Sequence, residues 1–290
     1  MENDSLFGDD ADPPGPSVEI VASASDAASI FLDSPAEALP VVSKAKPQRQ
    51  YFPFKDSPRA KSFRQKHYPD ISRLEWFDWR WQFQNAIRDV ETLGSIIRLS
   101  DNERQAMIQP SYGLPVAITP YYASLLSVDN EASPLRRTVV PVVDECLYTK
   151  GEEEDPLGED ADSPVPGLVH RYPDRVLFLV TDLCSTYCRY CTRSRIFGRR
   201  HQCFVDLEKW ENALSYIEAN PNIRDVLLSG GDPLVLSDDR LEWLLCRLKK
   251  IRHVELIRIG TKVPAVLPQR ITPALVAMLK KYHPLWMSIH

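Results

Sequence analysis

The sequence of 290 residues lacks a long apolar run, and its amino-terminal region lacks positive charge. No stretch approaches the roughly 20 apolar residues that a membrane-spanning helix needs, so we expect no membrane partner. Residues 1–43 hold none of the 35 Lys and Arg residues, which excludes the basic start of a secretory signal and argues against a transit peptide. We therefore expect a cytoplasmic protein.

Cysteine is scarce as well, with six residues in the chain. Cytoplasmic thiols stay reduced, so a group of cysteines there more often binds a metal or reacts than forms disulfides. Three of the six, Cys184, Cys188 and Cys191, lie in "LCSTYCRYCTRSR" with the spacing C-x3-C-x2-C, and the stretch has no fourth cysteine. It therefore predicts a bound group held by three thiols.

Acidic residues dominate the amino terminus. Nine of the chain's 40 Asp and Glu residues lie in residues 1–43, among many Ala, Ser and Pro residues. Such a segment buries too little apolar surface to fold, so we expect residues 1–50 to be a disordered tail.

Residues 51–165 are expected to form a helical region and a linker. Apolar and aromatic residues at helical spacing predict one helix near 76–93, and Ser100 with Glu103 has the capping-box spacing that starts another. Residues 151–167, "GEEEDPLGEDADSPVPG", are acidic and rich in turn residues. They are expected to be a surface loop with a solvated acidic face, because they lack the spacing of an EF-hand calcium loop.

Strands alternate with helices from residue 166 to the end. Apolar runs predict buried strands at 175–181, in "DVLLSGGDPL", at 254–261 and at 285–290, separated by helices at 207–220, 237–251 and 272–283. This alternation is typical of βα units on a parallel sheet. The sequence therefore predicts an α/β fold, a partial parallel (β/α) barrel of about four strands.

Polar residues follow each predicted strand at its carboxyl end. They are the cysteine cluster, Gly230-Gly231-Asp232, Thr261-Lys262 and His290. Active sites of parallel barrels lie on the loops after the strands, so we expect these features to meet on one face.

The metal groups that thiols can bind differ in the number of protein ligands they take. A structural zinc ion takes four protein ligands, and Cys203 or His201 could supply the fourth. An iron–sulfur cluster of the ferredoxin type also takes four thiolates, so three leave one iron open. The stretch resembles the radical S-adenosylmethionine superfamily, whose signature has an aromatic residue before the third cysteine, here Tyr190. The resemblance implies a 4Fe–4S cluster whose open iron binds S-adenosylmethionine and produces a 5′-deoxyadenosyl radical.

The glycine pair fits the same resemblance. In that superfamily a Gly-Gly-Glu-like motif holds the methionyl part of S-adenosylmethionine, which implies this role for Gly230, Gly231 and Asp232. Glycine lets a backbone approach a ligand closely. The alternative is an ordinary turn in which Asp232 caps the following helix.

Longer segments resemble the lysine 2,3-aminomutase family. They are "DPLGEDADSPVPGLVHRYPDRVLFLVTDLCSTYCRYCTRSR", "DVLLSGGDPL", "RIGTKVPAVLPQRIT" and "YHPLWMSIH". Members move an amino group between adjacent carbons of an amino acid, with pyridoxal phosphate as a further cofactor. The resemblance implies that Arg171 and Arg175 bind its phosphate, with Tyr172 beside its ring. It also implies that Arg193 binds the substrate carboxylate and that His290 lies near the adenosine.

One family feature is missing. The pyridoxal-binding lysine lies beyond the last residue of this sequence, and Lys262 is not its equivalent. An apolar strand at 285–290 would be unpaired at a sheet edge, which proteins avoid, so we expect a truncated chain that assembles its cluster poorly and makes no β-amino acid.

The expected function is that of a radical aminomutase. Free lysine is the expected substrate, with glutamate or a protein lysine as alternatives, and flavodoxin or ferredoxin as electron donor. No nucleic-acid partner is expected, and a homo-oligomer is left open. The alternative of another class is a non-catalytic zinc or iron–sulfur module.

Overall fold

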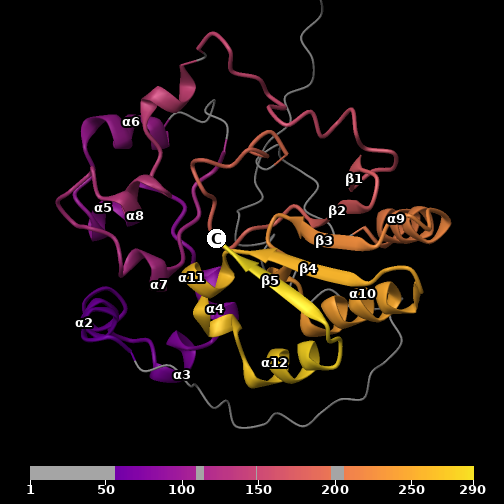
Figure 1. Ribbon diagram of the computed structural model, residues 1–290. Helices are drawn as coiled ribbons and strands as arrows, with labels where there is room; N and C mark the ends of the chain where they lie inside the picture. Colours follow the sequence, from indigo (N-terminus) through magenta and orange to yellow (C-terminus); the bar gives the residue numbers. More distant parts are fainter. Residues whose placement is uncertain (1–55, 109–113, 148, 197–205) are drawn as a thin grey trace, which may run out of the picture.

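A computed structural model describes residues 56–108, 114–147, 149–196 and 206–290. The predicted disordered tail and the alternative zinc ligands His201 and Cys203 lie outside these residues. Figure 1 shows a group of short helices, α2 to α8, beside a sheet with its own helices. Among the described residues no helix is long and apolar enough to cross a membrane.

The helical region consists of short elements, most of them started by a capping side chain. They are α2 (Pro58–His67), α3 (Arg73–Trp76), α4 (Trp79–Gln84), α5 (Val90–Ile96), α6 (Asp101–Ile108), α7 (Pro120–Ala123), α8 (Pro134–Arg137) and the 3-10 turn η1 (Val143–Cys146).

The prediction of one helix near 76–93 is wrong, because the segment forms α3, α4 and α5. Asp78 accepts a hydrogen bond from the backbone N–H of Arg80 and starts α4, and Asp89 accepts one from Thr92 and starts α5. Between them Ile87 pairs with Ile118 in an isolated β-bridge. Aspartate satisfies the free N–H groups at a helix start, so two such caps divide the aromatic stretch.

The capping box at the start of α6 is confirmed. The N–H of Ser100 donates to Glu103 at 2.8 Å, and the N–H of Glu103 donates back to the hydroxyl of Ser100 at 3.4 Å. Glu103 also pairs with Arg136 of α8 at 2.5 Å, and both side chains are almost fully buried. This ion pair joins α6 to α8.

The prediction of a partial parallel (β/α) barrel is confirmed. The strands are β1 (Leu168–Tyr172), β2 (Arg175–Thr181), β3 (Asp225–Gly230), β4 (Leu256–Thr261) and β5 (Leu285–Ile289), in the spatial order of the sequence. β2 to β5 are parallel. β1, which the sequence did not predict, pairs antiparallel with β2 across the turn Tyr172–Arg175.

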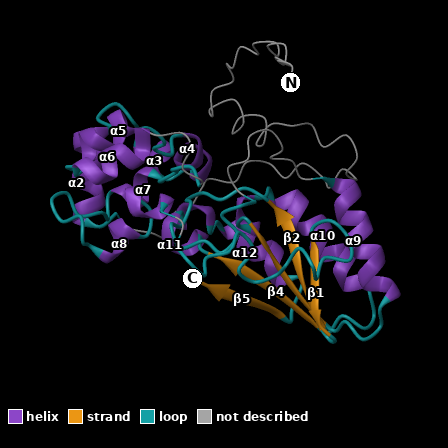
Figure 2. Ribbon diagram, turned by 90° about the horizontal axis from the view of Figure 1, so that it is seen from above, coloured by secondary structure: helices purple, strands orange, loops and turns teal. Residues whose placement is uncertain are grey.

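The helices of this part lie along one face of the sheet (Figure 2). They are α9 (Leu207–Ala219), α10 (Asp238–Lys250) and α12 (Pro273–Lys280), with the short elements η2 (Pro233–Val235), α11 (Val263–Val266) and η3 (Pro268–Arg270) following strand ends. Val176, Phe178 and Val180 of β2 are buried on the helix side, whereas Leu177 and Leu179 are half-buried on the other. Among the described residues the second face of the sheet is therefore less covered than the helix side.

The carboxyl ends of the parallel strands point toward the helical region (Figure 2). The Thr119 hydroxyl donates to the Val266 carbonyl at 2.5 Å, joining α7 to α11. The buried Arg270 guanidinium lies 4.8 Å from the Trp79 ring centroid and donates to the carbonyls of Leu234 and Leu236. These contacts fix the helical region against the strand ends, where the sequence places the site.

Candidate functional site

The three predicted cysteine ligands lie on the loop that directly follows β2. Cys184, Cys188 and Cys191 are free thiols, each partly buried as a residue. Burial raises the pKa of Cys184 well above its usual value and also raises the pKa of Cys191. Thiols protected from solvent in this way suit a cofactor that must be kept from water, and binding iron would displace their protons.

The loop is fixed to the helical region by Arg189. Its guanidinium pairs with Glu145 at 2.5 Å and donates to the carbonyls of Leu114 and Pro115. The backbone N–H of Arg189 donates to the Thr138 carbonyl. A cavity of about 490 Å³ opens here, lined in part by Arg189 and Tyr190. This volume is in the range of small-ligand pockets.

The glycine pair after β3 packs against the backbone of the cysteine loop. A Cβ on Gly230, whose φ is +114°, would lie 2.3 Å from the Thr181 carbonyl oxygen, and one on Gly231 would lie 2.0 Å from that of Leu183. The Gly231 N–H donates to Thr181 at 2.6 Å. The close approach that the glycines allow is therefore to the loop that carries Cys184.

Asp232 is buried, and its carboxylate accepts four hydrogen bonds from the chain itself. The donors are the N–H groups of Leu234, Lys262 and Val263 and the hydroxyl of Thr261. Burial raises the pKa of this carboxyl, although these hydrogen bonds act in the opposite direction. This geometry favours the alternative in which Asp232 is a cap, and it ties the end of β3 to the end of β4.

Lys262, after β4, reaches the cysteine loop. Its Nζ donates to Cys188 Sγ at 3.2 Å and to the hydroxyl of Tyr190 at 2.8 Å, and it lies 4.9 Å from the Tyr190 ring centroid. His290, after β5, donates its N–H to the Thr261 carbonyl at 3.1 Å. The features predicted to meet after the four strands do lie at one edge of the sheet.

Several buried polar atoms of this edge have no hydrogen-bond partner. Among the described residues they include Asp182 Oδ1, Ser185 Oγ and Thr186 Oγ1, all beside Cys184 in the sequence. Buried polar groups normally have a partner, so these atoms have hydrogen-bonding capacity left for a group bound at the cysteine loop.

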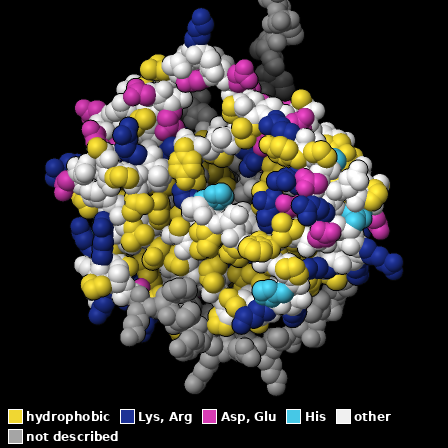
Figure 3. All heavy atoms as spheres, in the orientation of Figure 1, with side chains coloured by type: hydrophobic (Ala, Val, Ile, Leu, Met, Phe, Trp, Pro, Cys, Tyr) yellow, Lys and Arg dark blue, Asp and Glu magenta, His cyan; other side chains and the backbone are white. Residues whose placement is uncertain are grey.

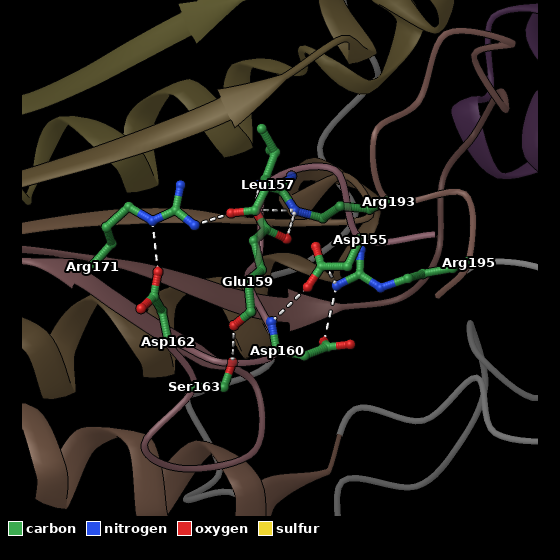
Figure 4. A network of polar contacts seen from close by, with 9 residues as sticks. All are labelled: Asp155, Leu157, Glu159, Asp160, Asp162, Ser163, Arg171, Arg193 and Arg195. Atoms are coloured by element: carbon green, nitrogen blue, oxygen red, sulfur yellow. Dashed lines mark hydrogen bonds and ion pairs between the residues drawn. The ribbon is translucent and has the colours of Figure 1, made fainter. Parts of the chain in front are cut away.

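The acidic loop, Asp155–Ser163, pairs with the arginines after the third cysteine (Figure 4). Arg195 contacts Asp155 at 3.1 Å and Asp160 at 2.9 Å. Most of this segment is exposed, as the prediction of a surface loop requires, but its acids are not all solvated, because opposite charge in "RSR" (193–195) holds the loop against the site.

Arg193, the predicted carboxylate ligand, is held by Glu159. The Nε donates to both carboxylate oxygens, at 3.1 and 2.8 Å, and Nη2 donates to Oε1 at 2.7 Å. Glu159 is buried, and Ser163 donates to its backbone carbonyl at 2.8 Å. One edge of the guanidinium is thus occupied, and Nη1 has no hydrogen bond to the described residues.

The predicted phosphate ligands lie on the β1–β2 hairpin. Arg171 donates to Asp162 at 2.6 Å and to the Leu157 carbonyl, so it contacts the acidic loop whose Glu159 holds Arg193 (Figure 4). The Arg175 guanidinium instead lies 5.5 Å from the Tyr172 ring centroid. Arg175 begins β2 and the cysteine loop follows its end, so this arginine is separated from the cysteine loop by about 20 Å along the strand at ~3.3 Å per residue.

Two comparisons with known proteins bear on this site. Residues 178–290 match the Radical SAM superfamily. The L-lysine 2,3-aminomutases of Acetoanaerobium sticklandii and Clostridium subterminale are 51% and 50% identical over 79% and 77% of this chain, covering 55% and 53% of their own length. The chain belongs to the lysine 2,3-aminomutase family. The glutamate 2,3-aminomutase of Clostridioides difficile is 39% identical over 74% of the chain and 51% of its own. The chain thus spans about half the length of these relatives.

Membership in the lysine 2,3-aminomutase family implies a 4Fe–4S cluster, S-adenosylmethionine and pyridoxal phosphate. Three free thiols on one loop, beside unpartnered buried polar atoms, fit the cluster and its ligand. No three His, Cys, Asp or Glu side chains of the described residues are arranged to hold a single metal ion. The arginines of the hairpin fit a phosphate in charge, and their carboxylate partners take part of their hydrogen-bonding capacity.

The sequence reasoning missed the contacts of two site residues. Glu159 was assigned to a solvated loop, and Lys262 was placed on the face of the site after its strand but without a contact to the cysteines. The acidic run was nevertheless a signal for Glu159, since arginines follow the third cysteine. For Lys262 the signal was its place directly after a strand whose neighbour carries the cysteines.

Proposed function

We propose that this chain carries the radical-generating part of a lysine 2,3-aminomutase. Its cysteine loop binds a 4Fe–4S cluster, and the adjoining strand ends bind S-adenosylmethionine. The observation that supports this most is the set of three free thiols at the carboxyl edge of a parallel sheet, in a chain about 50% identical to lysine 2,3-aminomutases.

The cluster residues are Cys184, Cys188 and Cys191. Three thiolates leave one iron open, where S-adenosylmethionine bound by its amino and carboxylate groups would supply the 5′-deoxyadenosyl radical. Tyr190, whose hydroxyl lies by Lys262, and His290, at the end of β5, border this edge from two sides.

The backbone at Gly230, Gly231 and Asp232 is also assigned to the binding of S-adenosylmethionine. The Asp232 carboxylate already accepts four hydrogen bonds from the chain itself. We therefore assign Asp232 the role of fixing the strand ends that face the ligand.

Arg193 is assigned to the substrate carboxylate. Glu159 occupies its Nε and Nη2 edge, which orients the guanidinium and leaves Nη1 as a donor. Arg171 and Arg175 are assigned to the phosphate of pyridoxal phosphate, because arginine donates parallel hydrogen bonds to phosphate oxygens, and Tyr172 is assigned a place beside its ring. That cofactor would supply a conjugated ring that stabilises the unpaired electron while nitrogen migrates.

Lysine is the proposed substrate. The L-lysine 2,3-aminomutases of Acetoanaerobium sticklandii and Clostridium subterminale are 51% and 50% identical to this chain, against 39% for the glutamate 2,3-aminomutase, although the L-lysine 2,3-aminomutase of Escherichia coli is 34% identical. A reducing protein such as flavodoxin or ferredoxin is the proposed electron donor, and the cytoplasm is the proposed location, because free thiols and an oxygen-sensitive cluster need a reducing compartment.

Anaerobic reconstitution with iron and sulfide tests this function. We expect visible charge-transfer absorption and bound iron and sulfide, below full occupancy, both lost in Cys188→Ala. Cys246→Ala is the matched control, since Cys246 is a partly buried thiol on α10, and it should leave iron uptake unchanged. Iron uptake equal in both variants, or absent from the unmodified chain, would contradict the proposal.

A zinc module is the second candidate, because zinc also accepts thiolates. Elemental analysis of protein purified without oxygen separates the two. One zinc per chain without iron or sulfide, lost in Cys203→Ser, would favour zinc, whereas the iron–sulfur function does not need Cys203.

A further inference from the structure

The side chain of Lys262 joins two ligand-bearing parts of the candidate site. It comes from the residue after β4 and contacts both Cys188 and Tyr190 of the loop after β2. Among the described residues these are the groups to which its ammonium donates. Neither contact is needed to complete the fold of β4, whose ladder to β3 and β5 is made by backbone groups.

The backbone of Lys262 is fixed by the buried carboxylate of Asp232. Its backbone N–H donates to Asp232 at 2.7 Å, and the preceding Thr261 hydroxyl donates to the same carboxylate at 2.6 Å. Asp232 in turn donates its N–H to the Leu183 carbonyl at 2.7 Å, next to Cys184. The ends of β2, β3 and β4 are therefore linked, and the ammonium is aimed at the thiol by a buried anchor.

We infer that Lys262 tunes the cluster: its ammonium donates an N–H···S hydrogen bond to the Cys188 ligand and stabilises the reduced cluster. This inference rests on the proposed function. Reduction adds one negative charge to the cluster, and a cation 3.2 Å from a ligand sulfur favours that state over the oxidised one. Hydrogen bonds to the sulfurs are among the determinants of cluster potential. Lys262 therefore raises the reduction potential.

The contact with Tyr190 keeps the ammonium in place. The phenol oxygen accepts at 2.8 Å, and the ring lies within cation–π distance. Tyr190 is exposed, so without Lys262 its ring would have no fixed position over the loop. Lys262 is thus a positioning residue for the loop as well as for the charge.

The test is a redox titration of the reconstituted full chain, followed by electron paramagnetic resonance and normalised to cluster content. Lys262→Met removes the donor and keeps the length of the side chain. Lys262→Arg keeps a charged donor. Lys281→Met is the matched control, since Lys281 pairs with Glu242 on the helix side of the sheet.

We expect a more negative midpoint potential in Lys262→Met and an unshifted one in Lys262→Arg and Lys281→Met. A Lys262→Met midpoint equal to that of the unmodified chain would overturn the inference and leave the proposed function intact. If Lys262→Met binds no cluster, uptake restored in Lys262→Arg supports the positioning role, and failure of both variants overturns it. An unmodified chain that takes up no iron overturns both this inference and the function.

Discussion

Gly231 shows how a single residue can determine the position of the cysteine loop. The chain passes so close to Leu183 that a Cβ would lie 2.0 Å from its carbonyl oxygen, closer than any van der Waals contact allows. The obstacle is backbone, which cannot rotate away as a side chain can. The sequence located this glycine correctly but connected it with a ligand, because spacing does not say what approaches the backbone.

Gly231→Ala is expected to displace the loop and lower iron and sulfide uptake several-fold. Metal and sulfide analysis after anaerobic reconstitution measures this effect. Gly260→Ala is the control, because a Cβ there would lie 3.7 Å from its nearest neighbours, an ordinary contact. Equal uptake by the two variants would show that the close approach at Gly231 does not control the loop.

At the scale of elements, the acidic loop Asp155–Ser163 is held by the arginines that follow the cysteines. Hydrogen bonds from the Asp160 backbone, with a smaller contribution from Arg195, hold the pKa of Asp155 below its usual value. A carboxyl with a lowered folded pKa stabilises the fold above its unfolded pKa and loses this contribution as pH falls through its folded value. The loop is therefore secured at neutral pH and weakened only in acid, below about pH 4.

Glu159→Gln is expected to loosen this loop. It replaces a charged, bidentate partner of Arg193 by a neutral amide, and because Arg193 is largely buried we expect a loss of about 1–2 kcal/mol in the free energy of unfolding. Chemical denaturation measures this loss, and limited proteolysis should cleave the loop faster.

Glu153→Gln is the matched control for Glu159→Gln, since Glu153 is an exposed glutamate six residues earlier. It should change neither stability nor cleavage. A Glu159→Gln protein with the stability and cleavage rate of Glu153→Gln would show that the ion pair does not hold the loop.

The same elements show what could be predicted. The parallel strands follow from apolar runs and the helices between them from their periodicity, because both patterns reflect burial on the sheet. The hairpin strand β1 was missed, since its residues His170, Arg171 and Tyr172 are only partly buried or exposed and carry no apolar run. The pairing of the acidic loop with Arg193 and Arg195 joins residues more than 30 positions apart, and no local pattern reports such a contact.

At the scale of the whole molecule, helices cover one face of the sheet, and among the described residues the other face is less covered. Figure 3 shows hydrophobic side chains over the middle of the visible face, around a hollow beside the carboxyl terminus. Within the described parts of the chain, β5 pairs with β4 alone and forms one edge of the sheet. Three of its side chains, Trp286, Met287 and Ile289, are exposed. An exposed apolar edge strand offers unpaired backbone groups and apolar surface to another chain.

We therefore expect the purified chain to self-associate through β5 at micromolar concentration. Trp286→Lys places a charge on this edge and should shift the light-scattering mass toward one chain without lowering the thermal midpoint, because Trp286 is 60% exposed and packs little core. Leu74→Lys is the control, since it makes the same change from an apolar to a charged residue at a side chain that is 68% exposed in α3. If Leu74→Lys reduced the mass as much as Trp286→Lys, the association would come from general hydrophobicity rather than from the edge of the sheet. Because an edge strand pairs through its backbone, a reduction specific to Trp286→Lys would place the contact at β5.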